Sequence, residues 1–339
     1  MAGKAALRRT VASAARTAAF ARFVAVLEQM ARPRPHVLPV LTYHRVDEPT
    51  RSPRLYPGLI SATPAEFEEQ MRFLASSYRP VALTELLAVR RGEARLPLRS
   101  VLVTFDDAYR DFADQAWPAM RRYGIPVTLF VATAYPGEPE KAFWWDRLYS
   151  VLMSADSSAP VATPAGDLSL VSGADRLRAF RRLRNYLKSA PHDRAMEIVE
   201  ELSAGLAPSS PSPAVLSWEE LRALAAHGVA LAPHSRTHPL LDRLPLEEAR
   251  EEIVGSLDDL EREIGSAPRV FAYPGGGVNG DVIAVLAEER FELAFLARRG
   301  SNDLRRADWL RLRRINVGRA SGLPLIRAQL LPWWTHTRR

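Results

Sequence analysis

The sequence predicts an α/β protein built around a barrel of parallel strands. From residue 37 onward, short apolar runs alternate with amphipathic stretches of helical spacing, which is typical of repeated β/α units. Apolar residues make up 47% and charged residues 25% of the chain, as in ordinary globular proteins. Barrels of this type often need roughly 200–250 residues. The 339 residues therefore suffice for one barrel and additional segments.

Composition excludes several other classes of protein. No stretch approaches the ~18–20 uninterrupted apolar residues of a membrane span. The chain has no cysteine, which excludes a disulfide scaffold, an iron–sulfur cluster, a thiolate zinc site and a cysteine nucleophile. Any metal ion must therefore be held by histidine and carboxylate side chains.

The first 35 residues are expected to form a basic helical arm. Seven Lys and Arg residues against the single acid Glu28 give this segment +6 of the total net charge of +7. The helical spacing marks one apolar face, made of Phe20, Phe23, Leu27 and Met30. This face either docks on the body of the protein or binds an anionic membrane surface or a partner protein.

The charge distribution also bears on partners and location. Only +1 remains for residues 36–339, whereas a nucleic-acid-binding body is expected to carry its own basic face. The longest uncharged run near the arm's apolar centre, residues 23–27, is too short for the core of a signal peptide. We therefore expect no nucleic-acid partner, and a cytoplasmic protein whose arm makes a peripheral contact with the inner membrane face.

The first three strands are expected between residues 37 and 133. In order, the elements are a strand at 37–43, a helix at 64–76, a strand at 100–105, a helix at about 111–123 and a strand at 125–133. Thr63 is a suitable N-cap and Pro64 fits the first helical position. Gly124 is a suitable C-terminal stop for the second helix.

A helical insertion of about residues 137–216 is expected after the third strand. It contains the aromatic cluster Phe143, Trp144, Trp145 and Tyr149, two helical stretches at about 174–189 and 191–204, and a Ser/Pro linker at 207–212. We thus expect three parts: the arm at 1–35, a barrel at 36–322 that carries the insertion, and a C-terminal tail at 323–339.

The β/α alternation resumes after the insertion. The expected elements are a helix at 218–227, a strand at 229–232, a helix at 246–264, a strand at 270–273, a helix to about 290, and strands at 293–296 and 310–317. Glycines 228 and 265 stop the first two helices. The last strand carries Arg311, Arg313 and Arg314, which we interpret as solvated charge on the barrel exterior.

The first of three motifs is Thr104-Phe105-Asp106-Asp107-Ala108-Tyr109, at the end of an apolar strand. In α/β folds the loops at the C-terminal strand ends carry active sites. Two adjacent carboxylates there need a compensating cation or proton. One can ligate a metal while the other acts as a base. Alone, the pair could equally be a helix N-cap beside a solvated acid.

The second motif is His234-Ser235-Arg236-Thr237-His238, followed by Pro239. Pro239 disfavours a helical conformation at His238, so both histidines belong to a loop after the strand. Two histidines and one carboxylate form an open metal site with positions left for water and substrate. Taken alone, they could be two surface histidines.

The third motif runs from Phe271 to Gly277 and contains Tyr273-Pro274-Gly275-Gly276. Glycines after a strand allow backbone N–H groups to approach a substrate closely, as an oxyanion hole requires. By itself such a segment is more often only a turn.

Together and in this order, the three motifs resemble those of the polysaccharide deacetylase family, the NodB-homology or family 4 carbohydrate esterases. TFDDAY is similar to the family's TFDDGY, HSRTH matches its His-Ser/Thr-x-x-His motif, and FAYPGG is similar to its third motif. LTYHRV and FWWDRL resemble a branch found among bacterial glycan-modifying proteins. The resemblance implies a distorted (β/α)7 barrel and metal-dependent hydrolysis of an N-acetyl group on a sugar of a bacterial glycan or exopolysaccharide.

The resemblance also implies roles for individual residues. Asp106 would be the general base, and the metal ligands would be Asp107, His234 and His238, with zinc the expected ion. The Gly275 N–H would stabilise the oxyanion. Tyr109 and Tyr273, which lie in the first and third motifs, are expected to contact the substrate.

Three departures from the family pattern affect the site. Ala108 replaces a glycine, a modest change if the backbone avoids positive φ there. Ala272 stands where the family often has an arginine that steadies the base, so Arg269 or Arg110 would have to replace it. The late Leu-x-Leu-His motif, source of the usual general acid, is absent, and the only histidine after His238 is His336.

His44 is the expected substitute for the missing general acid, because the first strand should end on the same face of the barrel. A structural histidine facing the core is the alternative for this residue. There are two alternatives for the whole chain. One is a related amidohydrolase acting on a non-sugar C–N bond, although the aromatic cluster favours a sugar substrate. The other is a catalytically inactive glycan-binding or scaffold barrel. A glycosidase is disfavoured, because neighbouring strand residues such as Asp106 and Asp107 point in opposite directions.

Overall fold

The computed structural model describes residues 17–138, 141–155, 159–206 and 214–332. Four cationic residues of the arm, Lys4, Arg8, Arg9 and Arg16, lie outside these ranges, as does His336. The three motifs and the expected barrel strands all lie within them.

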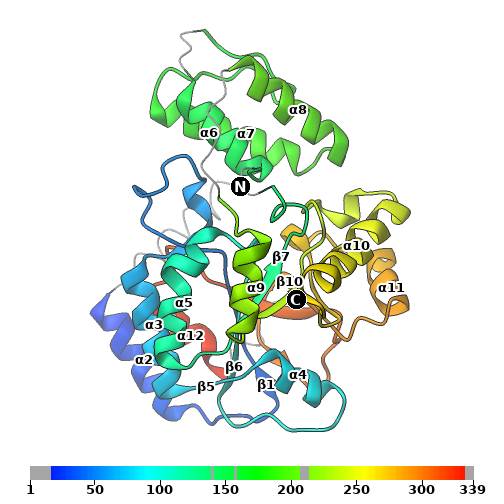
Figure 1. Ribbon diagram of the computed structural model, residues 1–339. Coiled ribbons are helices and arrows are strands. Elements are labelled where there is room, and N and C mark those ends of the chain that lie inside the picture. The colour runs from blue at the N-terminus through cyan, green and yellow to red at the C-terminus, as the bar shows by residue number, and fades with distance from the viewer. Residues whose placement is uncertain (1–16, 139–140, 156–158, 207–213, 333–339) are drawn as a thin grey trace.

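The described chain forms a nearly closed barrel of seven parallel strands, which confirms the expected (β/α)7 architecture (Figure 1). In spatial order the strands are β8 (Ala230–Pro233), β7 (Thr128–Val131), β6 (Ser100–Phe105), β2 (Val40–Tyr43), β12 (Leu312–Asn316), β10 (Leu293–Arg299) and β9 (Val270–Ala272). Each falls largely within a run predicted as a strand. The two edge strands, β8 and β9, lie close together, and His234 Nδ1 is 2.7 Å from the carbonyl oxygen of Ala272.

Parallel strands that are covered on both faces are expected to be apolar throughout. The burial of β6 illustrates this, because all six of its residues are buried. One cluster fills the barrel interior, where Phe130 and Phe295 pack edge to face with centroids 5.7 Å apart. A second cluster lies between the barrel and the helices outside it.

Five helices pack around the barrel near the predicted positions. They are α3 (Pro64–Ser77), α5 (Trp117–Tyr123), α9 (Trp218–Ala226), α10 (Leu246–Ile264) and α11 (Gly280–Glu288). The Thr63 side chain and Glu66 form a capping box at α3, and Gly124 ends α5 with φ of 63°. A π-helical turn at Phe112–Ala116 precedes α5.

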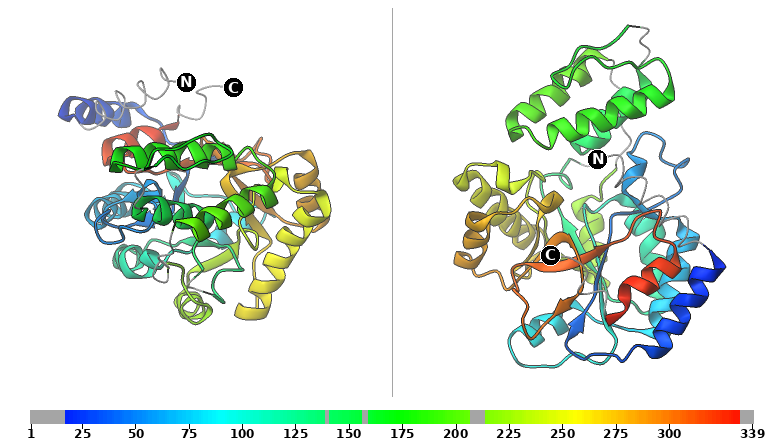
Figure 2. Two further views of the ribbon diagram at one scale, coloured as in Figure 1. Left: turned by 90° about the horizontal axis from the view of Figure 1, so that it is seen from above. Right: turned by 180° about the vertical axis from the view of Figure 1, so that it is seen from behind.

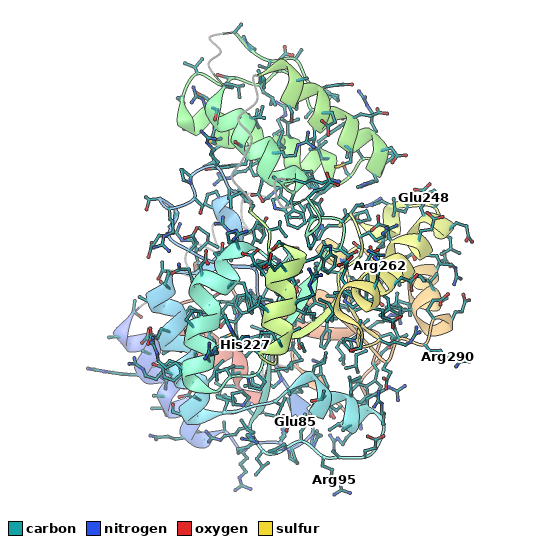
Figure 3. The ribbon with its side chains drawn as sticks, viewed as in Figure 1. Glu85, Arg95, His227, Glu248, Arg262 and Arg290 are labelled. Atoms are coloured by element: carbon teal, nitrogen blue, oxygen red, sulfur yellow. The ribbon has the colours of Figure 1, made fainter. Side chains whose placement is uncertain are left out.

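Several shorter elements lie at the ends of the barrel. Helix α4 (Leu83–Arg90), which the sequence analysis missed, lies at the end opposite the inserted helices, where Figure 3 labels Glu85 and Arg95. Short strands pair outside the barrel: β1 (Val37–Leu38) with β11 (Asn302–Asp303), β3 (Arg45–Val46) with β4 (Ile60–Ala62), and β5 (Arg79–Pro80) with β6. Single 3-10 turns occur at Pro57–Leu59, Leu241–Arg243 and Pro274–Gly276.

The inserted segment forms a bundle of three helices that lies over one end of the barrel (Figures 1 and 2). These helices are α6 (Trp144–Ser154), α7 (Gly173–Leu187) and α8 (His192–Gly205). They share a cluster of buried side chains of their own, centred on Phe180, Leu183 and Leu148. The helix α6 contains most of the aromatic cluster and was not predicted as a helix.

The arm helix α2 (Ala18–Met30) packs beside α12 (Leu323–Leu330), at the edge of the molecule (Figure 2). The contact buries Val24 and pairs Arg327 with Glu28. The expected apolar face is not fully covered, because Phe23 is 58% and Met30 70% exposed. In the described part of the chain, no helix has the length and apolar character needed to cross a membrane.

Candidate active site

The three motifs converge on one cavity at the C-terminal ends of the barrel strands. Asp106 follows β6, His234 follows β8, Tyr273 follows β9 and His44 follows β2. All four residues line a cavity of about 260 Å³ whose other wall comes from the inserted helices. The cavity therefore lies at the end of the barrel where α/β proteins place their ligands.

Asp107, His234 and His238 form a compact group of three candidate ligands. Their donor atoms all lie within 4.8 Å of one another. Asp107 Oδ1 is 3.6 Å from His234 Nε2 and 3.3 Å from His238 Nε2. The rings of the two histidines are nearly perpendicular, with centroids 4.9 Å apart. The structure thus brings together the three residues that the motifs suggested as ligands.

Two observations test whether this group fits a metal ion. Asp107 Oδ1 is fully buried and accepts no hydrogen bond from the described residues, which is unfavourable unless a cation compensates it. His234 uses Nδ1 on the Ala272 carbonyl, so its Nε2 faces the other two donors. Two imidazoles and a carboxylate with open positions are a donor set that suits zinc and similar divalent ions. The residues fit a metal ion.

The electrostatics of the group also suit metal binding. Burial, the largest influence, lowers the pKa of His234 to about 4, although the Asp106 carboxylate opposes this shift. His234 is therefore a neutral imidazole near pH 7. Burial alone would raise the pKa of Asp107, but the adjacent His238, followed by the charges of His44 and His234, holds it below its ordinary value. Asp107 is therefore a carboxylate.

Asp106 has a different partner from its neighbour. The Arg314 guanidinium donates two parallel hydrogen bonds to the Asp106 carboxylate, each 2.7 Å long. Both side chains are buried, which strengthens a bidentate pair of this kind. Burial would raise the pKa of Asp106, but the charge of Arg314, followed by that of His234, keeps it below its ordinary value. Asp106 is thus an oriented, ionised carboxylate beside the candidate metal site.

This pair corrects two expectations from the sequence. Arg314 is 1% exposed and lies inside the barrel, so it is not solvated exterior charge. It also occupies the place for which Arg269 and Arg110 were considered. Arg269 instead donates to the Glu289 carbonyl, and Arg110 pairs with Glu220. Arg314 is buried within β12, whereas Arg313 is partly exposed and Arg311, just before the strand, is exposed.

Backbone strain is concentrated in the first two motifs. Six non-glycine residues of the described chain have positive φ, and four of them are Asp107, Ala108, Ser235 and His238. Such conformations are unfavourable for residues with a Cβ atom and tend to occur at functional sites. Ala108 has φ of 51°, so the substitution of the family's glycine is not the mild change that we expected. The surrounding structure holds these residues in strained positions.

Hydrogen bonds fix the loop that carries the two histidines. The Ser235 hydroxyl accepts from the His238 N–H at 3.0 Å, and Glu252 accepts from two N–H groups of the loop. The Thr133 N–H donates to the Ser235 carbonyl at 3.1 Å. Trp145 packs edge to face on the His238 ring with centroids 4.8 Å apart. The inserted helices thus help to position a ligand residue.

The remaining predicted site residues lie in different places. His44 and Gly275 line the cavity, and Gly275 adopts φ of 57°, which favours glycine. Tyr273 also lines the cavity, but its hydroxyl donates to the Leu310 carbonyl at 2.9 Å. Tyr273 is fully buried, so it forms part of the cavity wall and its hydroxyl is already engaged.

Tyr109 does not contact the cavity, which corrects the expected substrate contact. Its side chain is fully buried, and its hydroxyl donates to Asp146 at 2.5 Å and accepts from Trp145 Nε1 at 2.8 Å. Asp146 in turn accepts the Tyr56 N–H at 2.6 Å, and burial raises its pKa to about 6. Tyr109 therefore joins the first motif to helix α6 and supports Trp145 behind His238.

Comparisons with known proteins agree with this geometry. A sequence model of the family described as "Polysaccharide deacetylase" matches residues 94–294, more than half of the chain. The poly-beta-1,6-N-acetyl-D-glucosamine N-deacetylase of Staphylococcus aureus is 33% identical over 79 residues. That segment covers 23% of this chain and 27% of the relative, so the similarity spans about a quarter of the curated protein's length.

Solved structures show the same fold at low sequence identity. The Streptococcus pyogenes deacetylase PplD, in complex with acetate, superposes with a TM-score of 0.60 at 18% identity, covering 88% of this chain and all of that one. IcaB from Ammonifex degensii gives a TM-score of 0.56 at 19% identity, covering 87% of this chain and 97% of that one.

Proposed function

The chain belongs to the polysaccharide deacetylase family, and on this premise we propose that it hydrolyses the acetamido group of an N-acetylated sugar in a bacterial glycan. The observation that supports this most strongly is the pairing of two adjacent aspartates with different partners. One has the surroundings of a metal ligand and the other those of a general base. Hydrolysis would release acetate and leave a free amine on the sugar.

We propose that Asp107, His234 and His238 hold a divalent metal ion, and that this ion is zinc, which suits two nitrogen donors and one oxygen donor. When bound, such an ion polarises the acetyl carbonyl and lowers the pKa of a water molecule. Asp106 then accepts a proton from the attacking water as the oxygen bonds to the acetyl carbon. Arg314 keeps Asp106 ionised and aligned.

The backbone at Gly275 is the candidate donor to the developing oxyanion. Gly275 lies on the cavity wall in a conformation that glycine adopts without strain. His44 is the candidate general acid, which would protonate the nitrogen as the C–N bond breaks. Its place at the end of β2, on the cavity wall, supports this role.

The walls of the cavity support a sugar substrate. Tyr56, Trp144 and Trp145 line it, and aromatic rings stack on the apolar faces of sugars. The Staphylococcus aureus relative is named for an N-acetylglucosamine polymer, which makes an N-acetylated hexosamine the first substrate to test.

The test is acetate release from a panel of N-acetylated and O-acetylated glycans, with and without a chelator. We expect the N-acetylated compounds to be hydrolysed and the chelator to stop the reaction until zinc is restored. Asp106→Asn is the matched control, because it should retain the metal ion and lose most activity. Loss of metal in Asp106→Asn would exchange the roles of the two aspartates, and an absence of acetate release from every compound would refute the proposal.

A further inference from the structure

We propose that the substrate carries a phosphate group next to its N-acetylated sugar, and that Arg184 and Lys188 bind this group. This inference rests on the proposed function, since it extends the same cavity. Both residues line the cavity, on the wall opposite the strand ends that carry Asp107 and the two histidines. The phosphate could belong to a sugar phosphate, a nucleoside diphosphate sugar or a lipid-linked sugar.

The two cations come from the same end of one helix. Arg184 lies in the last turn of α7, and Lys188 follows directly after the helix ends at Leu187. Residues four apart lie on the same face of a helix, so both side chains are directed to the same region. Leu187, between them, also lines the cavity. The end of α7 therefore forms a basic wall.

This basic wall has no acidic counterpart among the described residues. No carboxylate oxygen of the described chain lies within ion-pair distance of Arg184 or Lys188, whereas three other arginines of the bundle are paired. These pairs are Arg147 with Glu200, Arg178 with Asp175, and Arg194 with Glu197. Arg184 and Lys188 differ from these three arginines in lining the cavity and in having no carboxylate partner among the described residues.

The acids of the cavity do not balance the basic wall either. Asp106 is paired with Arg314, and Asp107, whose charge also acts on Lys188, belongs to the candidate metal site. A further cation, Arg243, also lines the cavity, and its nearest carboxylate contact is 3.9 Å from the neighbouring Asp242. Arg184, Lys188 and Arg243 therefore leave a surplus of positive charge beside the sugar position.

The charge of Arg184 repels that of Lys188, whose side chain is exposed. Desolvation and then this charge lower the pKa of Lys188, while the charge of Asp107 opposes the shift. A bound anion would relieve this repulsion. The Arg184 guanidinium is held in place by the Tyr56 hydroxyl at 2.6 Å and by packing near the Phe180 ring. The Arg184 side chain is thus already held in position to bind a phosphate, whereas the Lys188 side chain can move toward it.

Cations at a helix C-terminus also offset the helix dipole, which gives a structural reason for basic residues there. That reason does not require them to line the cavity or to lack acidic neighbours. A phosphate fits better than a sugar carboxylate because two or three cations face the site. Arginine and lysine are both common phosphate ligands, and a diphosphate carries more than one negative charge.

The experiment compares two substrates that differ in the anion. N-acetylglucosamine 1-phosphate and methyl N-acetylglucosaminide are offered to the wild-type protein and to Lys188→Glu, and kcat/KM for acetate release is measured. We expect Lys188→Glu to lower kcat/KM for the phosphorylated sugar by about tenfold or more, the effect of losing one charge-assisted contact. The neutral glycoside should change less than about twofold.

Arg95→Glu is the matched control, because Arg95 is exposed at the opposite end of the barrel (Figure 3) and the substitution changes the net charge equally. It should affect neither substrate. Arg184→Lys, which keeps the positive charge, should retain part of the preference for the phosphorylated sugar. The same proteins are also titrated calorimetrically with N-acetylglucosamine 1-phosphate in the presence of chelator, so that binding is measured without turnover.

The outcomes separate this inference from the proposed function. Equal effects of Lys188→Glu on both substrates, or tight binding of the phosphorylated sugar that survives Lys188→Glu, would overturn the inference while leaving deacetylation intact. Absence of hydrolysis with retained, Lys188-dependent binding would overturn the proposed function alone. Parallel assays with a nucleoside diphosphate N-acetylglucosamine and with a short-chain polyprenyl diphosphate N-acetylglucosamine in detergent distinguish the two sources of phosphate.

Discussion

At the scale of single residues, partners decide what two adjacent aspartates do. Asp106 and Asp107 have the same chemistry and similar burial, yet one faces Arg314 and the other faces His234 and His238. Both follow the end of β6 and line the same cavity, and Asp106 Oδ2 is itself 3.9 Å from His234 Nε2, so the ion pair with Arg314 is what distinguishes the surroundings of Asp106. The strained φ of 75° at Asp107 shows that the surrounding structure enforces this division.

Arg314→Gln should move the acidic limb of the kcat/KM profile to higher pH. The cation holds the pKa of Asp106 below its ordinary value, so its removal raises that pKa, and the base stays protonated until a higher pH. A cation at this distance typically lowers the pKa of a carboxyl group by about 1–3 units, so the limb should move by a similar amount. The profile is measured by acetate release, with metal content checked.

The exposed Arg311 supplies the control for this experiment. Arg311→Gln removes the same charge from the start of the β12 region, where it pairs with Asp308. It should leave the profile in place. An acidic limb that does not move in Arg314→Gln would mean that Asp106 is not the group that titrates there.

His44→Ala should lower kcat by at least about tenfold with the metal content unchanged, because a positioned imidazole that protonates the leaving amine contributes about 10²–10⁴-fold. An unchanged rate would leave Asp106 acting as base and acid in turn. Loss of folding, monitored by circular dichroism, would mark His44 as a structural residue.

At the scale of elements, the helix α2 is both docked and incompletely covered. Val24 and Glu28 face the body, while Phe23, Val26 and Met30 remain more than half exposed. The flanking Arg22 and Arg32 are exposed as well. An apolar stripe beside cations fits the surface of an anionic membrane, so we propose that α2 attaches the protein peripherally to the inner membrane face.

The double variant Phe23→Glu, Met30→Glu should lose binding to vesicles that contain anionic lipid. Each basic residue near such a surface contributes up to about 1 kcal/mol, which salt screens, and the apolar side chains add to this. Binding is measured by vesicle co-sedimentation. Val171→Glu, at a similarly exposed apolar residue of the insertion, is the control. Equal binding by all three proteins would show that α2 is only a docked helix.

At the scale of the whole molecule, the site is assembled from segments far apart in the chain. The candidate metal ligands follow β6 and β8, the proposed base is paired with an arginine of β12, and the second wall comes from α7 and α8. Because all barrel strands are parallel, their C-terminal ends meet at one face. A metal ion held there should therefore stabilise the folded barrel as a unit.

Removal of the metal should lower the melting temperature of the wild-type protein, and added zinc should restore it. An ion present at about 100 times its Kd adds about 2.7 kcal/mol to the free energy of unfolding. His238→Ala should melt at the same temperature with and without chelator, and Asp106→Asn should respond as the wild type does. The melting temperature of each protein is measured by scanning calorimetry with chelator and with added zinc. A zinc response that survives in His238→Ala would remove His238 from the ligand set.

The sequence alone was sufficient to predict features that are encoded in short segments of the chain. Apolar runs at the barrel strands, the caps at Thr63 and Gly124, and the motifs around Asp107 and His234 are all written in short segments, so the architecture and the ligand group were accessible. Helix α4 was missed because its apolar residues lack a clear helical period. Helix α6 has such a period, but its residues were interpreted only as an aromatic cluster. In contrast, the contacts between residues far apart in the sequence could not be predicted. Arg314 appeared as surface charge, because a strand that is buried on both faces does not reveal which arginine meets a carboxylate more than two hundred residues away. For the same reason Tyr109 seemed to be a substrate residue, and the basic wall at Arg184 and Lys188 was not recognised. Charge and burial in this site depend on which strand ends and helices meet, and that is a property of the folded barrel.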